Sequence, residues 1–366
     1  MLKTFYNMRF TPFAFFGNMD KIPPGTLQID FGLVSGGNWV RDINLFSNGD
    51  IGFAGTDANP NNVIGGGVSI FNSSGQWQTG VYRDLGRYSP VSDVITTIDR
   101  NNDGTYVVGN GSTSWSAYAF PVSYITGLTK TVIITSGCTY SSNYAAVSVA
   151  PNYLRNTANY GTVMTGVGGA TGYYASVVFS GLTDPTRFNI QSDGKIVFCT
   201  TTGLKRYNTN GTIDTGFTSA ITGQTNDVAF QSDGKLVVVG FGVTGGVTRL
   251  NTNGTYDTSF SGVTSGFDST GLIGYDVWSV TIDSQDRAIV GVPSPTYNGI
   301  SIGGITRLQQ NGSIDTSAGF GVGFNGGLNG YGVYRVKIQP NDLLIVAGNF
   351  SGYKGQPVGS AVRLYT

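Results

Sequence analysis

One ten-residue phrase occurs twice in this chain, about 40 residues apart. The copies read NTNGTIDTGF at 208–217 and NTNGTYDTSF at 251–260. Each closes a longer unit that contains a strand, an Asp-Gly turn, an apolar strand, a variable loop, a third strand and an Asn-Gly turn. Asp-Gly and Asn-Gly supply the positive φ angles of tight hairpins, and alternation in VAF and LVVV favours strands over helices. The repeat therefore predicts a four-stranded antiparallel meander.

Weaker copies extend this pattern along the chain. We number seven units in chain order, and they cover 43–81, 95–109, 140–182, 187–217, 226–260, 280–320 and 336–366. Units of this length with four strands each are typical of β-propellers. We therefore expect an all-β fold, a seven-bladed β-propeller of four-stranded antiparallel blades. Unit 3 diverges most, and whether it is a regular blade stays open.

The two ends of the chain complement each other. Unit 7 stops at RLYT, 363–366, where its fourth strand would begin. The stretch PGTLQIDF at 24–31 aligns without a gap with NGTYDTSF at 253–260. We expect residues 24–31 to complete the last blade together with 332–366. This closes the ring and leaves no open sheet edge between the ends.

The repeat also carries a family resemblance. QSDGKLVVVG at 231–240, followed by RLNTNGTYDTSF at 249–260, resembles the delta-60 repeat of bacterial and phage propeller-like proteins. The resemblance is sharp over 187–260, fair over 276–366 and weak over 40–180. It implies a propeller scaffold and an extracellular or virion setting. It implies no catalytic residues, because the family motif is structural.

Composition excludes several classes of site. The chain has no histidine and no glutamate, so all 21 acidic residues are aspartates. Catalytic systems that use Ser-His-Asp or Cys-His, and histidine metal sites, are therefore excluded. Net charge is zero and 11% of residues are charged, so the chain lacks the excess of positive charge that is typical of a nucleic-acid binder. No segment approaches the roughly 20 apolar residues of a membrane span. We expect no nucleic-acid partner, no membrane insertion and no enzyme.

An aromatic segment precedes the repeats. Residues 1–23 carry no clear cleavage site, and polar residues interrupt their apolar run, so we expect no signal peptide. Exposed apolar surface of this kind marks an interaction site. We predict two domains, a docking arm of residues 1–23 and a propeller of 24–366. The arm residues predicted to dock onto a partner are Phe5, Tyr6, Phe10, Phe13, Phe15 and Phe16.

One turn resembles the start of a calcium loop. Asp99, Asn101 and Asp103 in DRNNDG place several oxygens on one turn, as calcium requires. The twelfth position is Asn110 rather than glutamate, and the other units have an ordinary hairpin here. A plain turn and a metal site both stay open. Calcium is the one candidate cofactor.

Loop aromatics are candidates for carbohydrate contact. Aromatic rings on loops stack on sugars or anchor a protein interface. Trp39, Trp115 and Tyr88 lie outside the predicted strands. Scattered surface aromatics are the alternative interpretation.

A charge pattern repeats between the third and fourth strands. In three units an arginine precedes an aspartate by eight residues, and we predict a structural contact rather than a binding site. The pairs are Arg206 with Asp214, Arg249 with Asp257, and Arg307 with Asp315.

Fold does not give function, and three classes remain. The first is a non-enzymatic structural component of a phage virion, near its tail, which docks onto neighbouring virion proteins through the arm. The second is an adhesin that recognises host surface glycan through loop aromatics. The third is a hydrolase that uses paired aspartates. We favour the first, and the adhesin is the alternative.

Overall fold

The computed structural model describes fifteen stretches of the chain. In these stretches all regular structure is β-strand, apart from two short 3-10 turns, η4 (Thr244–Gly246) and η5 (Thr316–Ala318). The prediction of an all-β chain is therefore confirmed. None of the described residues belongs to a helix long and apolar enough to cross a membrane. The described residues are 23–28, 40–45, 49–55, 66–83, 94–100, 106–111, 156–157, 162–163, 177–178, 185–208, 211–267, 277–292, 296–321, 323–325 and 332–366.

The strands of the first three units form separate antiparallel sheets. Unit 1 gives the order β1 (Val40–Leu45), β2 (Ile51–Gly55), β3 (Gly66–Phe71) and β4 (Trp77–Arg83). Unit 2 gives β5 (Val94–Arg100) and β6 (Tyr106–Gly111). Unit 3 gives β7 (Asn156–Thr157), β8 (Thr162–Val163) and β9 (Val177–Val178).

The last four units each form a three-stranded antiparallel sheet. Unit 4 gives β10 (Pro185–Ile190), β11 (Ile196–Thr200) and β12 (Gly203–Tyr207), and unit 5 gives β13 (Asp227–Phe230), β14 (Leu236–Val239) and β15 (Val247–Leu250). Unit 6 gives β16 (Ser279–Ile282), β17 (Ala288–Gly291) and β20 (Ile305–Leu308). Unit 7 gives β22 (Val333–Ile338), β23 (Leu343–Gly348) and β26 (Ala361–Tyr365).

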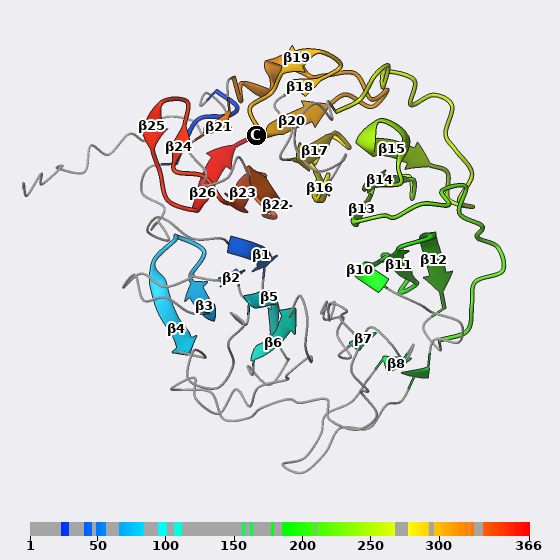
Figure 1. Ribbon diagram of the computed structural model, residues 1–366, viewed down its shortest axis with the longest axis horizontal. Helices are drawn as coiled ribbons and strands as arrows, with labels where there is room; N and C mark the ends of the chain where they lie inside the picture. Colours follow the sequence, from blue (N-terminus) through cyan, green and yellow to red (C-terminus); the bar gives the residue numbers. More distant parts are fainter. Residues whose placement is uncertain are drawn as a thin grey trace, which may run out of the picture.

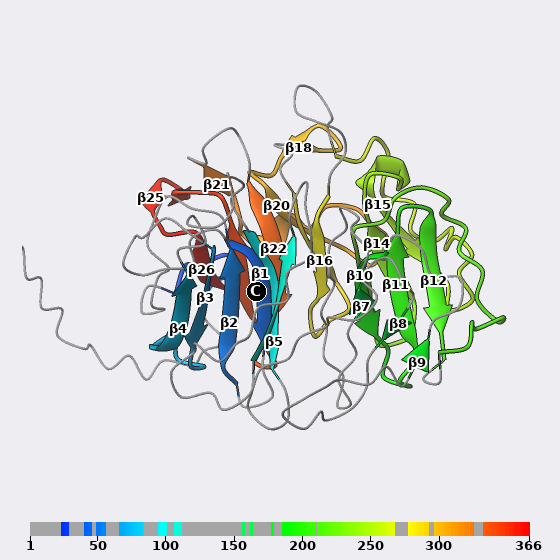
Figure 2. The same ribbon diagram turned by 60° about the horizontal axis from the view of Figure 1, so that its bottom comes forward.

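These sheets follow one another around a common centre, with the first strand of each unit innermost (Figure 1). The inner strands contact in the order β5, β1, β22, β16, β13 and β10. The contact between β1 and β22 brings the first and last units side by side. Seen after a 60° turn, the sheets stand next to one another around the molecule (Figure 2). This is a propeller-like arrangement.

The core lies between neighbouring sheets, and the second strand of each unit supplies both sides of it. In β14, Leu236 and Val238 pack against unit 4, whereas Val237 and Val239 pack against unit 6. Alternate residues of β23 likewise face units 6 and 1. A strand that is covered on both faces needs an unbroken apolar run. The LVVV run therefore reflects burial between two sheets.

The fourth segment of units 4 to 6 is shorter than the strand that we expected. Each makes one isolated bridge to the third strand: Tyr207 with Ile213, Leu250 with Tyr256, and Leu308 with Ile314. The aspartate that follows redirects the chain. The N–H of Phe217 donates to the carbonyl of Asp214 at 3.1 Å, which closes a turn.

Residues 25–28 lie along β26, where the alignment of 24–31 places the fourth strand. Gly25 N–H donates to the carbonyl of Tyr365 at 2.7 Å, and Gln28 N–H donates to that of Arg363 at 2.9 Å. Leu27 bridges Leu364. Gly25 has φ +71°, and a Cβ there would lie 2.4 Å from the carbonyl oxygen of Gly319. Glycine is therefore required at this turn.

The first-to-second-strand turns come in two versions. In units 4 and 5 the left-handed position is glycine, Gly194 (φ 84°) and Gly234 (φ 81°), as the Asp-Gly pattern predicts. In units 6 and 7 the same position holds Asp286 (φ 58°) and Asp342 (φ 60°). Aspartate tolerates this region better than most residues, but glycine adopts it at no steric cost. An additional interaction must therefore favour aspartate in units 6 and 7.

Units 6 and 7 also carry an inserted hairpin between their second and third strands. The first is β18 (Thr296–Tyr297) with β19 (Ile300–Ser301), and the second is β24 (Gly352–Tyr353) with β25 (Gln356–Pro357), joined by β21 (Phe324–Asn325). Both central turn residues have positive φ, 49° and 77° at Asn298 and Gly299, and 48° and 78° at Lys354 and Gly355. This is the type I′ geometry that suits the twist of a hairpin.

Candidate functional site

The aromatic candidates fall outside the described residues. These are the six arm residues Phe5, Tyr6, Phe10, Phe13, Phe15 and Phe16, and the loop residues Trp39, Tyr88 and Trp115. Their assignments to docking and to glycan contact therefore stay predictions.

The calcium candidates are described only in part. Asp99 lies in β5, paired in register with Val107 of β6, whereas Asn101 and Asp103 lie outside the described residues. In the described part of the chain, no three cysteine or aspartate side chains form a group that fits a metal ion. The calcium assignment stays a prediction.

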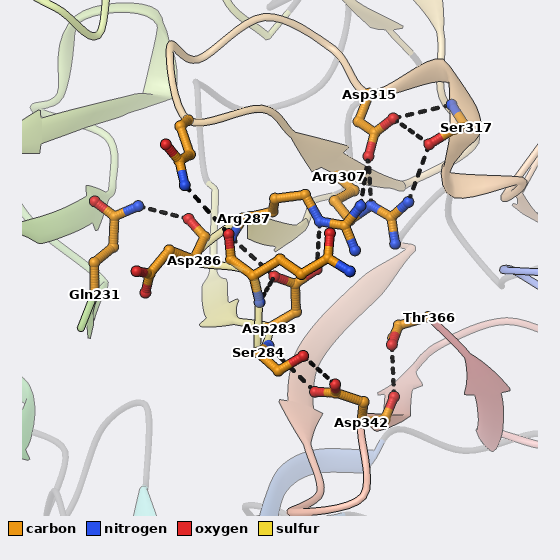
Figure 3. A network of polar contacts seen from close by, with 12 residues as sticks. Gln231, Asp283, Ser284, Asp286, Arg287, Arg307, Asp315, Ser317, Asp342 and Thr366 are labelled. Carbon is orange, nitrogen blue, oxygen red and sulfur yellow. Dashed lines mark hydrogen bonds and ion pairs between the residues drawn. The ribbon is translucent and has the colours of Figure 1, made fainter. Parts of the chain in front are cut away.

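The polar groups that the structure brings together lie on the turn face, which we define as the end of each sheet with the first-to-second and third-to-fourth turns. In an antiparallel meander these two turns lie at the same end. Figure 3 shows this face at units 5 to 7, where arginines and aspartates of different turns point toward one another.

The predicted arginine–aspartate contacts are present on this face. Nε lies 2.8 Å from Oδ2 in the pairs of units 4 and 5, and 2.7 Å in unit 6. A second cation, from the start of the second strand, reaches the same carboxylate. The nitrogen that lies near Oδ2 is Nζ of Lys195 at 3.0 Å in unit 4, Nζ of Lys235 at 3.2 Å in unit 5 and Nη1 of Arg287 at 3.4 Å in unit 6. The prediction of a repeated contact between third and fourth strands is confirmed.

These contacts lower the pKa of all three carboxyl groups. Burial alone raises the pKa of Asp257, but hydrogen bonds from Ser259, Lys235 and Arg249 outweigh it and hold the pKa well below its usual range. Burial is likewise outweighed at Asp315, where Ser317 and Arg307 donate. The pKa of Asp214 is lowered in the same way. These carboxyl groups are therefore ionised at neutral pH.

The same arginines link each sheet to the next. Nη1 of Arg206 donates to the carbonyl of Thr252, 2.7 Å away in the third-to-fourth turn of unit 5. Arg249 reaches Gln310 in unit 6 at 2.5 Å, and Arg363 reaches Ser73 in unit 1 at 2.5 Å. Each guanidinium thus satisfies a turn carbonyl of the following sheet. The last of these links joins unit 7 to unit 1.

Arg307 differs from the other three. Its side chain is 1% exposed, and its Nη1 has no hydrogen-bond partner in the described residues. The other three arginines donate to a turn carbonyl of the following unit, and in unit 7 the residue that aligns with those acceptors is Thr366. The Thr366 hydroxyl instead donates to the carbonyl of Asp342 at 2.7 Å (Figure 3).

The aspartates at left-handed turn positions bind the preceding unit. Asp286 accepts from the N–H of Ser232 at 2.8 Å and from its hydroxyl, and Gln231 Nε2 donates to the Asp286 carbonyl at 2.6 Å. Asp342 accepts from Ser284 in the same manner, at 3.2 Å for the N–H. These bonds supply the interaction that offsets the backbone cost of a non-glycine residue.

A polar hollow lies beside this network in unit 6. Its volume is about 500 Å³, and its lining residues are Gln285, Arg287, Gln309, Gln310, Asn311 and Ser313. Its one charged lining residue, Arg287, forms ion pairs with Asp283 at 2.7 Å and with Asp315 at 3.4 Å. The hollow thus combines amides, a hydroxyl and a neutralised guanidinium.

Analysis of the sequence missed two features of the turn face, the bonds of Asp286 and Asp342 to the preceding unit and the hollow in unit 6. The signal for the bonds was aspartate at a turn position that is glycine in units 4 and 5. The signal for the hollow was three glutamines in unit 6, where unit 5 has Asp233, Asn251 and Thr252. The tight turns of unit 6 bring these glutamines together.

A family model matches part of the repeat region. It is a β-propeller domain of unknown function (DUF5122), and it matches residues 191–217 and 231–260, within units 4 and 5. No sequence among the curated proteins matches the chain.

Solved structures similar to this one include a WD40 β-propeller domain, a lyase and a bacterial surface component of a secretion system. The WD40 β-propeller domain of Doa1 is 14% identical with a TM-score of 0.55, over 93% of this chain and 97% of that one. Virginiamycin B lyase from Staphylococcus aureus, as a catalytically inactive variant with quinupristin, is 12% identical with a TM-score of 0.56, over 93% and 99%. PorZ of Porphyromonas gingivalis is 13% identical with a TM-score of 0.52, over 90% of this chain and 46% of that one. The matches and the arrangement of the sheets identify this chain as an all-β protein with a propeller-like fold.

Proposed function

We propose that this protein is a non-enzymatic structural and interaction propeller of a phage virion, associated with the tail. It docks onto neighbouring virion proteins through an N-terminal arm of residues 1–23. The scaffold is a delta-60 repeat propeller of seven four-stranded blades, and the strand at 24–31 closes its ring. The seven sequence units and the hydrogen bonds of residues 25–28 to β26 support this scaffold.

The observation that carries the proposal is the firm attachment of the chain immediately after the arm. The carbonyl of Gly25 accepts from Tyr353 Oη at 2.7 Å and from Lys354 Nζ at 3.0 Å. Pro23 accepts from the Thr26 hydroxyl at 2.6 Å. Residues 23–28, which follow the arm in the sequence, are therefore held at a fixed place on the sheet. A segment tethered in this way transmits a docking contact to the whole rigid body.

Three observations support a non-enzymatic role. Asp214, Asp257 and Asp315 have lowered pKa values, so these three carboxyl groups carry no proton to donate at neutral pH. Their oxygens are occupied by structural hydrogen bonds. The similar lyase is inactive when one of its histidines is replaced with alanine, and this chain has no histidine.

The virion setting rests on the resemblance to the delta-60 repeat and on composition. Aromatic side chains in the arm supply the apolar surface that a partner subunit would cover. The adhesin alternative remains compatible with docking if the arm binds the particle and another surface binds the host.

The experiment compares the full chain with a version that lacks residues 1–22. This boundary keeps Pro23 and the hydrogen bonds of residues 25–28. A matched control keeps the arm but replaces its six aromatic residues, Phe5, Tyr6, Phe10, Phe13, Phe15 and Phe16, with serine. Mass in solution by light scattering and incorporation into phage particles are measured.

We expect the full chain to self-associate in isolation and to enter particles. Both altered chains should be monomers that unfold at the same temperature and stay out of particles. If all three chains enter particles equally, the arm is not the docking element. If no version enters particles, the virion proposal fails.

A further inference from the structure

The hollow in unit 6 differs from the matching surface of unit 5 in the type of side chain that lines it. In unit 5 the short side chains are used within their own turns. Asn251 Nδ2 donates to Thr255 Oγ1 at 3.0 Å, and Asp233 Oδ1 accepts from the N–H of Lys235 at 3.0 Å. These bonds shape the turns and leave little free for a ligand.

In unit 6 the matching residues are longer and are not needed by the turns. The backbone of the third-to-fourth turn is held by Gln309 N–H to Ser313 carbonyl, at 2.8 Å, as in the other units. Within the described part of the chain, the side-chain amides of Gln285 and Gln309 have no hydrogen-bond partner. The Gln310 amide makes one long bond of 3.4 Å, to the carbonyl of Gln285.

The floor of the hollow is rigid. The carbonyl of Gln310 accepts from Arg249, and Arg287 is held by Asp283 and Asp315. The N–H of Gly262 donates to the carbonyl of Asn311 at 2.7 Å. The amides thus extend from backbone that neighbouring units fix in place. Such pre-organisation lowers the entropic cost of binding.

The charge of the hollow favours a neutral ligand. Arg287 is the one charged residue of the lining, and its charge is compensated by ion pairs with Asp283 and Asp315. An amide offers a donor and an acceptor side by side, and a hydroxyl group also donates and accepts. The lining has no apolar wall of the kind that holds peptide side chains. Its volume is within the range of about 300–1,000 Å³ for small-ligand sites.

We propose that the hollow between the turns of unit 6 binds a neutral, hydroxyl-rich saccharide through the amides of Gln285, Gln309 and Gln310. Arg287 supplies a further donor without net charge. This inference deepens the adhesin alternative and is independent of docking through the arm. No aromatic residue lines the hollow, so affinity at one site is weak, with a dissociation constant of about 1 mM.

The test is saturation-transfer NMR of the full chain with three neutral probes, maltotriose, cellotriose and triacetylchitotriose. The altered chain carries Gln285→Ala, Gln309→Ala and Gln310→Ala. The matched control is Thr252→Ala, the position of unit 5 that corresponds to Gln310. Each single glutamine variant is measured as well, so the result does not depend on folding of the triple variant.

We expect at least one probe to bind the native chain and the Thr252→Ala control equally. The triple variant should bind that probe at least 10-fold more weakly, with an unchanged melting temperature. Absence of binding by all three probes would overturn the proposal. So would unchanged binding after the triple substitution. Because particle incorporation is read separately, failure here leaves the docking proposal standing.

Discussion

Units 4 and 5 and units 6 and 7 use one sheet design but join it to their neighbours differently. Units 4 and 5 have glycine turns and no inserted hairpin between their second and third strands, and their arginines reach across the turn face to the next sheet. Units 6 and 7 replace the turn glycine with Asp286 and Asp342, each bonded to a serine of the preceding unit. They also insert a tyrosine hairpin.

The two hairpins make the same contact in different surroundings. Tyr297 Oη donates to the carbonyl of Gly312 at 2.8 Å, in a turn that is continuous in the chain. Tyr353 Oη donates to the carbonyl of Gly25 at 2.7 Å, and that glycine lies 328 residues away in the sequence. Of these two contacts, the one made by Tyr353 joins the two ends of the chain. A sheet that is completed by a distant segment lacks the local chain connection that stabilises the others.

The largest effect should come from removing the carboxylate that pairs with the most buried arginine of the three repeated pairs. Asp315→Ala leaves the guanidinium of Arg307 without its partner at 1% exposure, and such a loss costs about 3–5 kcal/mol. Asp214→Ala is the matched change at a pair with 8% and 11% exposure, and we expect about 1–3 kcal/mol there. Denaturant unfolding measures both. Equal losses of unfolding free energy would mean that the deeper burial of the pair in unit 6 does not increase its contribution to stability.

Acid should weaken units 4 to 6 through the same carboxylates. The folded pKa values of Asp214, Asp257 and Asp315 lie below the unfolded value of about 3.9. Their contribution is therefore complete above about pH 4 and is lost as the pH falls further. We expect constant melting temperatures from pH 7 to 5 and a steep fall below pH 4. Asp257→Asn should flatten that fall, whereas a decline that begins above pH 5 would indicate other groups.

Removing the hydroxyl of Tyr353 should loosen the attachment of residues 25–28. Tyr353→Phe deletes a buried hydrogen bond, with a loss of about 0.5–1.5 kcal/mol. Tyr297→Phe deletes the matching bond in unit 6. Hydrogen exchange of residues 25–28 should become faster in the first variant only. Faster exchange in both variants would mean that the two hairpins act on the ring as a whole.

The smallest effect should come from transferring the turn aspartate to unit 5. Gly234→Asp places a non-glycine residue at a left-handed position, which by itself costs about 1–2 kcal/mol. Ser192 of unit 4 matches Ser232, the partner of Asp286, so a new bond should reduce the net loss to about 0.5 kcal/mol. Adding Ser192→Ala in a double-mutant cycle measures that bond. If the coupling free energy in this cycle is zero, a bond to the serine of the preceding unit is not the reason for aspartate at the turn position.

The regular elements were predictable because their causes are local. The Asn-Gly turns, the LVVV strand and the eight-residue spacing of Arg249 and Asp257 depend on residues close together in the sequence. The short fourth segment was not predicted from the sequence. It is short because Asp214 and its equivalents end the pairing after one bridge. The hollow was missed because its glutamines meet only once two separate turns pack side by side.

The sequence by itself determined the all-β class, the repeat and the polar pairs within each unit, because hairpin and strand preferences act over a few residues. Only the tertiary structure decided how the units join. How neighbouring sheets pack decides three contacts between units. These are the contact of Arg206 with Thr252, that of Asp286 with Ser232 and that of Tyr353 with Gly25. Such contacts join residues 46 to 328 positions apart, and no short sequence pattern encodes them.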